Sequence, residues 1–497
     1  MKQLLSTLSA LKYALIGLFL VHSALAQGYD DPLTFQGIDH STIQSAASRA
    51  LGSTTIGLQN DVGLMFSNPA SLQSLKGAQI SVGGVQQFEQ MTQVQQYAPL
   101  KYYANFSLLM EGLTNIIRNP DTSFHVTNPN AGDTVQRPYD KIGPNWSHSK
   151  NKGQPIQALL SVPFAIGQLK MAAGLGVVQY ADLNHYYENH NVLNPSIGSE
   201  RPVPVELPAS DSVPYRTQWS SFLRSREGSI TGYGIALSCS LSDRISFGVS
   251  GMALKGSTDD YEQHIARGTL VFYKNWFILD SVDGWRTKTG TSDYSGQEFT
   301  FSGIYGGRYV SLGFSVKPPM TITRSYARQV LSDTAGSLSV ATERGQDKLS
   351  LPWRGTFGLS VAVRDDIRLG LEYEVRSYAS AVYTDTGGKE SNLWLSSSAL
   401  HLGAEYSPMT WLSLRVGVRG QSEVFEETGN PMPGEPVTYS VYSAGCGISL
   451  GNARLNLAYE YAPMKYQDMW QANVNLNNST RHTIHADIVW EIPQCMQ

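Results

Sequence analysis

The sequence predicts an all-β fold, a single transmembrane antiparallel β-barrel of about 14 strands with an N-terminal plug in its lumen. Six times, two runs of alternating apolar and polar residues are joined by a short turn, which is the pattern of a β-hairpin. Charged residues make up only 16%, whereas Gly (46) and Tyr (26) are plentiful. This composition favours a membrane barrel over a soluble β-sandwich, whose polar face would be rich in Lys and Glu.

The first 26 residues have the features of a secretory signal peptide. Lys2 and Lys12 precede the apolar stretch Tyr13–Val21, and small residues at 23–26 suit a cleavage site before Gln27. The alternative is a retained anchor helix, for which the apolar stretch is short. No cysteine lies at the predicted cleavage site, so we do not expect this protein to be a lipoprotein. A barrel with this leader is expected in the outer membrane of a Gram-negative bacterium.

Residues 27–76 are expected to fill the barrel, which is wide enough at this strand number to leak unless something occupies it. Small side chains between Ser45 and Gly52 suit a compact insert with a short helix. Asn68-Pro69-Ala70 predicts a tight turn, because the residue before a proline avoids the helical region. We therefore predict a plug at 27–76 and a barrel at 77–497.

The strands can be counted from the alternation. A first strand at about 77–88, six hairpins and a last strand at about 482–492 give an even number, as single-chain bacterial barrels require. Short turns should be periplasmic and the long links between hairpins extracellular. The six turns are expected near Gly167, Ser242-Asp243, Pro318-Pro319, Arg364–Asp366, Ser407–Thr410 and Gly451-Asn452.

Each predicted strand has an apolar face for lipid and a polar face for the lumen. The clearest hairpin, 357–378, alternates Phe, Leu, Val and Tyr with small or charged residues. Ion pairing would offset the desolvation of charges of both signs. Two interpretations remain open, a conducting polar channel and a salt-bridged wall that closes the lumen. The expected lumen network consists of Arg368, Glu372, Glu374, Arg376, Arg415, Arg419, Glu460 and Asp487.

Several functions find no support in the sequence. Cys239 and Cys446 are in phase with apolar neighbours and are expected to face lipid as free thiols, and no spacing suggests a metal or another cofactor. A net charge of -4 offers no basic patch for nucleic acid. An outer-membrane lipase or protease would need a nucleophile with His and a carboxylate, but no G-x-S-x-G elbow occurs, so we predict no enzyme.

Three features of the N-terminal region together resemble the hatch of the FadL/TodX outer-membrane transporters. They are the run that ends in Arg49-Ala50-Leu51-Gly52, Asp61 about ten residues later, and Asn68-Pro69-Ala70 before the first strand. The predicted strand number agrees, as do Val162-Pro163-Phe164, Lys317-Pro318-Pro319 and Leu351-Pro352-Trp353.

The resemblance implies passive uptake of hydrophobic molecules, such as long-chain fatty acids or aromatic hydrocarbons, by a monomer. The ligand would leave sideways through a gap at a kinked third strand, where Gly174 and Gly176 are candidates for the kink. Membrane lipid, lipopolysaccharide and the outer-membrane assembly machinery are the expected partners. Trp490 would take the role of the terminal aromatic residue that such barrels often carry.

The first long loop offers a candidate pocket for an apolar ligand. Leu109, Leu113, Ile116 and Ile117 are spaced as on one face of a helix, which would lie over the barrel mouth. An ordinary loop core is the alternative. A second function is also open, since some FadL-like barrels of the PorV type hold exported proteins at their extracellular loops in type IX secretion.

Overall fold

A computed structural model gives the fold of the chain. It describes residues 34–39, 43–97, 146–194, 212, 214–272, 277–280, 284–334, 336–392, 394–423, 436–470 and 473–492. The predicted signal peptide and the candidate loop pocket (Leu109, Leu113, Ile116 and Ile117) lie outside these residues. Within the ranges just given, no helix is both long and apolar enough to cross a membrane.

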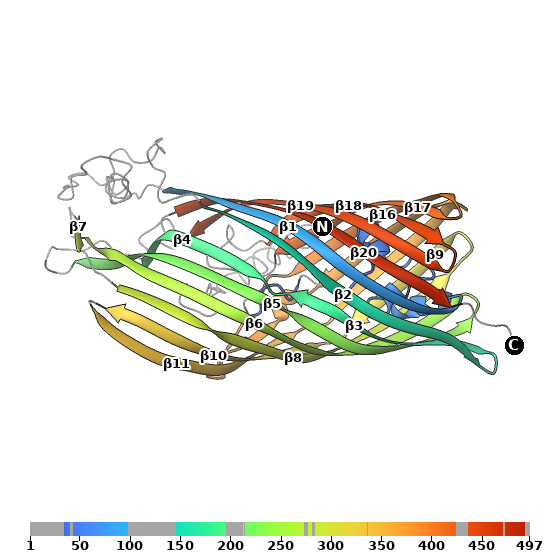
Figure 1. The fold of residues 1–497 in the computed structure, drawn as a ribbon, viewed down its shortest axis with the longest axis horizontal. Helices are drawn as coiled ribbons and strands as arrows, with labels where there is room; N and C mark the ends of the chain where they lie inside the picture. The colour runs from blue at the N-terminus through green and yellow to red at the C-terminus, as the bar shows by residue number, and fades with distance from the viewer. Residues whose placement is uncertain are drawn as a thin grey trace, which may run out of the picture.

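The described residues form one antiparallel sheet that closes on itself, because β1 pairs with both β2 and β20 (Figure 1). The strands are β1 (Ala78–Tyr97), β2 (Trp146–Ile166), β3 (Leu169–Asp182), β4 (His185–Asn194), β5 (Tyr215–Ser242), β6 (Ile245–Phe272), β7 (Phe277–Asp280), β8 (Gly284–Gly306), β9 (Val310–Lys317), β10 (Met320–Thr334), β11 (Ser337–Leu351), β12 (Arg354–Arg364), β13 (Ile367–Arg376), β14 (Val382–Thr384), β15 (Glu390–Ser391), β16 (Ser397–Met409), β17 (Leu412–Glu423), β18 (Val437–Leu450), β19 (Ala453–Trp470) and β20 (Asn473–Ile492).

Fourteen of these strands go around the barrel once, as predicted. β4 continues β3, β10 continues β9, and β12 continues β11, while β7, β14 and β15 are short additions to their neighbours. The remaining pairings follow chain order from β1 to β20. The closed 14-strand barrel predicted from the alternation is therefore confirmed.

The predicted turn at Pro318-Pro319 is wrong. Lys317 pairs with Arg354 and Met320 pairs with Leu351, so the register is the same on both sides of the two prolines. One strand thus passes through them, because proline removes only its own ladder hydrogen bond while the neighbouring strand keeps the register. The turn lies instead at 307–309, where Gly307 N donates to Val310 O at 2.8 Å.

The strands are also longer than the alternation indicated. β5 and β6 have 28 residues each, whereas about 9–11 suffice to cross a membrane. Most of the predicted loops at 182–230 and 257–303 are therefore strand. We call the projecting part the sleeve; in Figure 1 it extends to the left, well past the ends of β16–β18. Its residues are 185–194, 215–230, 256–272, 284–294, 324–334 and 337–347.

Exposed apolar side chains form a band around the barrel between two girdles of aromatic residues, as outer-membrane barrels require. Val416 and Ile488, both more than half exposed, belong to this band. Exposed aromatic residues near the short turns include Tyr305, Trp411 and Trp490, and those at the other edge include Tyr233, Tyr373, Tyr442 and Tyr459.

Candidate functional site

The chain before β1 passes through the barrel interior. We call residues 34–39 and 43–76 the luminal segment; it contains α2 (Ala46–Ala50), η1 (Val62–Leu64) and η2 (Pro69–Ser74). α2 packs against β17–β20, and η2 packs on the opposite side against β5, β6 and β8. Figure 1 shows this segment, in blue, surrounded by the strands. A polar barrel interior of this width is thus occupied by part of the same chain.

Asp61 organises the first half of the luminal segment. Its carboxylate accepts the Ser45 hydroxyl at 2.6 Å and the Gly63 N–H at 2.8 Å, so it caps η1. Ser45 in turn accepts Ser48 N–H at 3.2 Å and caps α2. Capping by a side-chain oxygen satisfies donors that the helix leaves unpaired. One buried carboxylate therefore fixes the starts of both short helices.

Asn68, Pro69 and Ala70 start η2, where proline occupies the first helical position. Asn68 is fully buried, and its carbonyl accepts Ser71 N–H at 3.0 Å. Ala70 N–H donates to the Ser302 hydroxyl of β8 at 2.8 Å. The motif therefore attaches η2 to the barrel wall as well as turning the chain towards β1.

Part of the predicted lumen network binds backbone of the luminal segment. Glu372 accepts the N–H groups of Thr55 at 2.5 Å and Ile56 at 2.7 Å. Asp487 accepts Ala46 N–H at 2.7 Å, and Arg368 donates to Gly57 O at 2.8 Å. These charged side chains of the wall thus satisfy main-chain groups of the luminal segment.

The other predicted lumen residues form ion pairs. Arg376 lies 2.7 Å from Glu374 and Arg415 lies 2.8 Å from Glu405. Glu460 pairs with Arg419 of the wall and, at 4.0 Å, with Arg49 of the luminal segment. The wall is thus partly salt-bridged, and Glu460 also joins it to α2.

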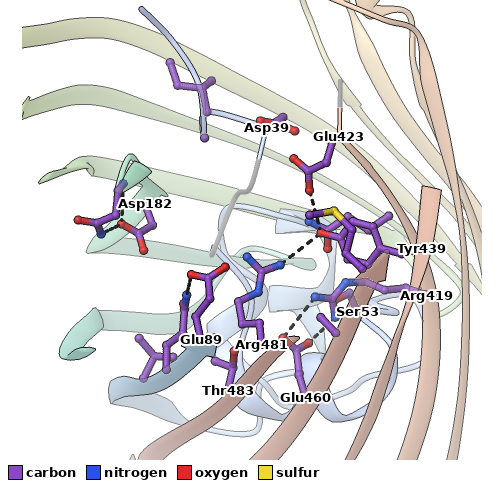
Figure 2. Close-up of a pocket in the computed structure, with 18 of the residues that line it drawn as sticks. Asp39, Ser53, Glu89, Asp182, Arg419, Glu423, Tyr439, Glu460, Arg481 and Thr483 are labelled. Atoms are coloured by element: carbon purple, nitrogen blue, oxygen red, sulfur yellow. Dashed lines mark hydrogen bonds and ion pairs between the residues drawn. The ribbon is translucent and has the colours of Figure 1, made fainter. Parts of the chain in front are cut away.

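Above the luminal segment lies a cavity of about 740 Å³. Arg49, Ser53 and Thr55 contribute to its lining from the luminal segment. Figure 2 shows Arg419, Glu460, Arg481, Tyr439 and Glu423 gathered on one side of this cavity, with Asp182 on the other. Its apolar lining residues include Ile38, Ile43, Val85, Met91, Val437, Met464 and Tyr466. The cavity therefore offers both charged and apolar surfaces.

One buried cluster at the cavity wall was not predicted. Glu298 is 1% exposed and contacts Lys317 at 2.5 Å, Arg354 at 2.6 Å and the Tyr180 hydroxyl at 2.8 Å. This cluster could not be predicted from the sequence, because Glu298 lies in a segment that was expected to be a loop. Lys317 precedes Pro318-Pro319 and Arg354 follows Pro352, and the pairing of β9 with β12 brings the two residues together.

The third strand is interrupted beyond Val178 and not at Gly174 and Gly176, where the kink was expected. Gly174 and Gly176 lie in a ladder that is paired with β2 on one side and β5 on the other. Pairing of β2 with β3 ends at Gln157 and Val178, and β3 slips against β5 between Gln179 and Ala181. Beyond this point, among the residues that the structure describes, β2 pairs with β1 alone and β4 with β5 alone.

Side chains span the seam between residues 146–156 of β2 and residues 179–194 of β3 and β4. Gln154 Nε2 donates to Gln179 Oε1 at 2.7 Å. Lys152 lies 3.7 Å from Asp182, and the His148 ring stacks on Tyr186 with 3.8 Å between centroids. The large cavity is lined by residues from both sides of this seam. The cavity therefore reaches the part of the described wall where β2 and β4 share no backbone ladder.

Arg226 ties the start of the luminal segment to the break in the third strand. Its guanidinium is buried and donates to Leu183 O at 2.7 Å, Thr34 O at 2.9 Å, Gln36 O and, at 3.3 Å, the Tyr294 hydroxyl. Leu183 is one of the two residues between β3 and β4. One side chain of β5 thus holds both elements.

Within the parts of the chain that the structure describes, no group of three or more His, Cys, Asp or Glu residues is arranged to hold a metal ion. Cys239 and Cys446 are free thiols of intermediate exposure.

Searches with this chain match no family model and no curated protein. Solved structures do match. A Pseudomonas aeruginosa FadL homologue aligns with a TM-score of 0.58 and 12% identity, covering 90% of this chain and 98% of the other. The P. putida toluene transporter TodX aligns with a TM-score of 0.55 and 13% identity, covering 90% and 98%. The chain has the fold of the FadL/TodX channels, as its hatch motifs predicted.

Proposed function

We propose that this protein carries hydrophobic small molecules passively across the outer membrane of a Gram-negative bacterium. The observation that carries the proposal is a closed barrel whose lumen is occupied by its own N-terminal segment, in a fold shared over nearly its whole length with a FadL homologue and a toluene transporter. In this proposal residues 1–26 are a signal peptide, 27–76 a hatch and 77–497 the barrel, which works as a monomer.

The seam between β2 and β4 is the proposed lateral exit. Cargo would enter the large cavity from the outside and leave between the two strand edges, which side chains but no backbone ladder join among the described residues. Because the cavity has charged and apolar surfaces, a molecule with a polar end and an apolar body suits it better than a bare hydrocarbon. A long-chain fatty acid is therefore the preferred cargo.

Cross-linking the seam tests this route. Gln154→Cys and Gln179→Cys would be joined with a short bismaleimide in cells that lack other outer-membrane fatty-acid transport. Uptake of radiolabelled oleate should fall at least tenfold, and the matched control is Arg328→Cys with Glu343→Cys, since these residues already pair across β10 and β11. Oleate uptake that survives complete cross-linking would rule out this exit. No uptake by the unmodified protein would remove the transport proposal itself.

The sleeve supports a second candidate function, the handling of exported proteins at the cell surface. Residues 337–347 of β11 pair with β10 but with no other strand among the described residues, so one edge offers main-chain groups for an added strand. This reading needs no transport. Co-purification of a surface protein with the intact chain, lost when 324–347 is deleted, would favour it over uptake.

A further inference from the structure

Two cavities lie one above the other along the wall formed by β13, β16 and β17. The upper one is the 740 Å³ cavity described above, and the lower one has about 170 Å³. On each of these strands, the upper-cavity residue nearest the lower cavity is four positions from the nearest lower-cavity residue, and both side chains point inward. The three pairs, upper residue first, are Glu372 and Arg368, His401 and Glu405, and Arg419 and Arg415.

A row of glycines separates the two cavities. Gly370 lies opposite Gly403, and Gly403 lies opposite Gly417, each halfway between an upper and a lower lining residue. The turn at 51–54 of the luminal segment sits on this row. A Cβ at position 417 would lie 2.0 Å from Gly52 N, and a Cβ at position 403 would lie 2.5 Å from Leu51 O. Only glycine lets the turn approach so closely.

Three wall residues hold the turn and the residues beside it, namely Glu372, His401 and Ser443. The Ser443 hydroxyl accepts Gly52 N–H at 3.1 Å and donates to Ala50 O at 3.1 Å. Glu372 accepts Thr55 and Ile56 N–H, and His401 Nδ1 lies 2.9 Å from Gly52 O. Between the upper and the lower cavity, this part of the wall thus meets a single turn of chain. Its contacts there are a few hydrogen bonds and the close fit to the glycine row.

The lower cavity carries an excess of positive charge. Arg368, Arg415 and Arg454 line it together with two carboxylates, Asp61 and Glu405. Arg415 pairs with Glu405, but Arg368 and Arg454 donate to main-chain oxygens of the luminal segment instead of to carboxylates. A path through this cavity would therefore favour anions over cations.

We propose that the barrel contains a second, axial route for small inorganic anions, closed by the 51–54 turn in the glycine row. This route runs along β13, β16 and β17 and is separate from the seam between β2 and β4. The anion route needs a hydrated lumen and no apolar cargo. Its test is therefore independent of the test of fatty-acid uptake. Opening requires only that the turn leave the row, while the rest of the luminal segment stays in place.

Single-channel current across a planar lipid bilayer tests the route with the purified full-length protein. Gly417→Ala places a methyl group against Gly52 and should displace the turn, whereas Gly420→Ala on the same strand meets no atom closer than 3.8 Å. In KCl, the first variant should conduct at least tenfold more than the unaltered protein and the second should match it. A KCl gradient should give a reversal potential of the sign that chloride selectivity requires.

Loss of the carboxylate anchor opens the same turn without adding bulk. Glu372→Ala should raise the current, while Glu423→Ala should not, because Glu423 lines the same cavity but accepts the Tyr439 hydroxyl at 3.0 Å. A disulfide then locks the turn. The Thr54 Cβ lies 3.4 Å from the Cβ position of residue 370, close to the span of a disulfide, so Thr54→Cys with Gly370→Cys should form one.

In the Glu372→Ala background, the oxidised lock should abolish the current and a reductant should restore it. Circular dichroism and protease resistance identify the variants that fold. Folded Gly417→Ala and Glu372→Ala proteins that conduct no more than their controls would overturn the proposal. So would a current that persists through the oxidised lock, since it would run elsewhere, and a cation-selective current would overturn the assignment of anions.

Discussion

Removal of the Arg226 side chain should release the start of the luminal segment. In Arg226→Leu, the carbonyls of Thr34, Gln36 and Leu183 lose their buried, charged donor. Two of these bonds, to Thr34 and Gln36, hold residues 34–39, so at about 1.5 kcal/mol each the local free energy of opening should fall by roughly 3 kcal/mol. Since about 1.4 kcal/mol is a factor of ten, amide hydrogens at 34–39 should exchange about 10²-fold faster.

Hydrogen exchange followed by mass spectrometry measures this directly on the peptide that covers residues 34–39. The control is Arg224→Leu, because Arg224 is equally buried two residues away and pairs with Glu262 at 3.2 Å. Exchange at 34–39 should remain within about threefold of the unaltered protein in the control. If Arg226→Leu also leaves it within that range, Arg226 does not hold the segment and the reasoning from its four hydrogen bonds fails.

Three further predictions concern the membrane band, the caps and the thiols. Val416→Lys should lower the free energy of unfolding in lipid vesicles by about 2–4 kcal/mol. Val340→Lys, equally exposed but on the sleeve, should change it by less than about 0.5 kcal/mol. Equal effects of the two substitutions in urea titrations would contradict the placement of the membrane band. Asp61→Ala should lower the free energy of local unfolding of the luminal segment by about 2–3 kcal/mol, because a helix cap and a buried hydrogen bond are lost together. Protease should then cut within residues 43–76, and unchanged digestion would refute the capping role. Cys239 and Cys446 should resist a charged maleimide in intact vesicles and react in denaturant, and fast labelling in vesicles would exclude a lipid-facing position.

Local alternation was sufficient to predict the barrel. Each spanning strand must present an apolar side to lipid and a polar side to the lumen. The period-two alternation therefore predicts both the number of strands and the side to which each residue points. Val416 and Arg415 illustrate this, since one is exposed to lipid and the next is buried inside. The pattern is lost above the membrane, where both faces of the sleeve tolerate polar residues, so the alternation does not reveal the strands of the sleeve.

The hatch motifs were also visible in the sequence. The resemblance to the FadL/TodX hatch singled out Arg49 and Asp61, and the tight turn expected before Pro69 singled out Asn68 as well. Their partners could not, since Asp61 binds a hydroxyl 16 residues away and Arg49 approaches a glutamate on β19. Similarly, the sequence showed that Glu372 faces the lumen, but not that it accepts main-chain hydrogen bonds.

Only the tertiary structure decided which strands pair with each other and where the barrel wall lacks a backbone ladder. Two prolines at 318 and 319 resemble a turn, yet the pairing of neighbouring strands carries one strand through them. The break after Val178 likewise depends on which strands lose their partners, not on the glycines nearby. A residue's own preferences set its secondary structure and its face, but strand register, ion-pair partners and the fit of the 51–54 turn to its glycine row depend on residues hundreds of positions apart.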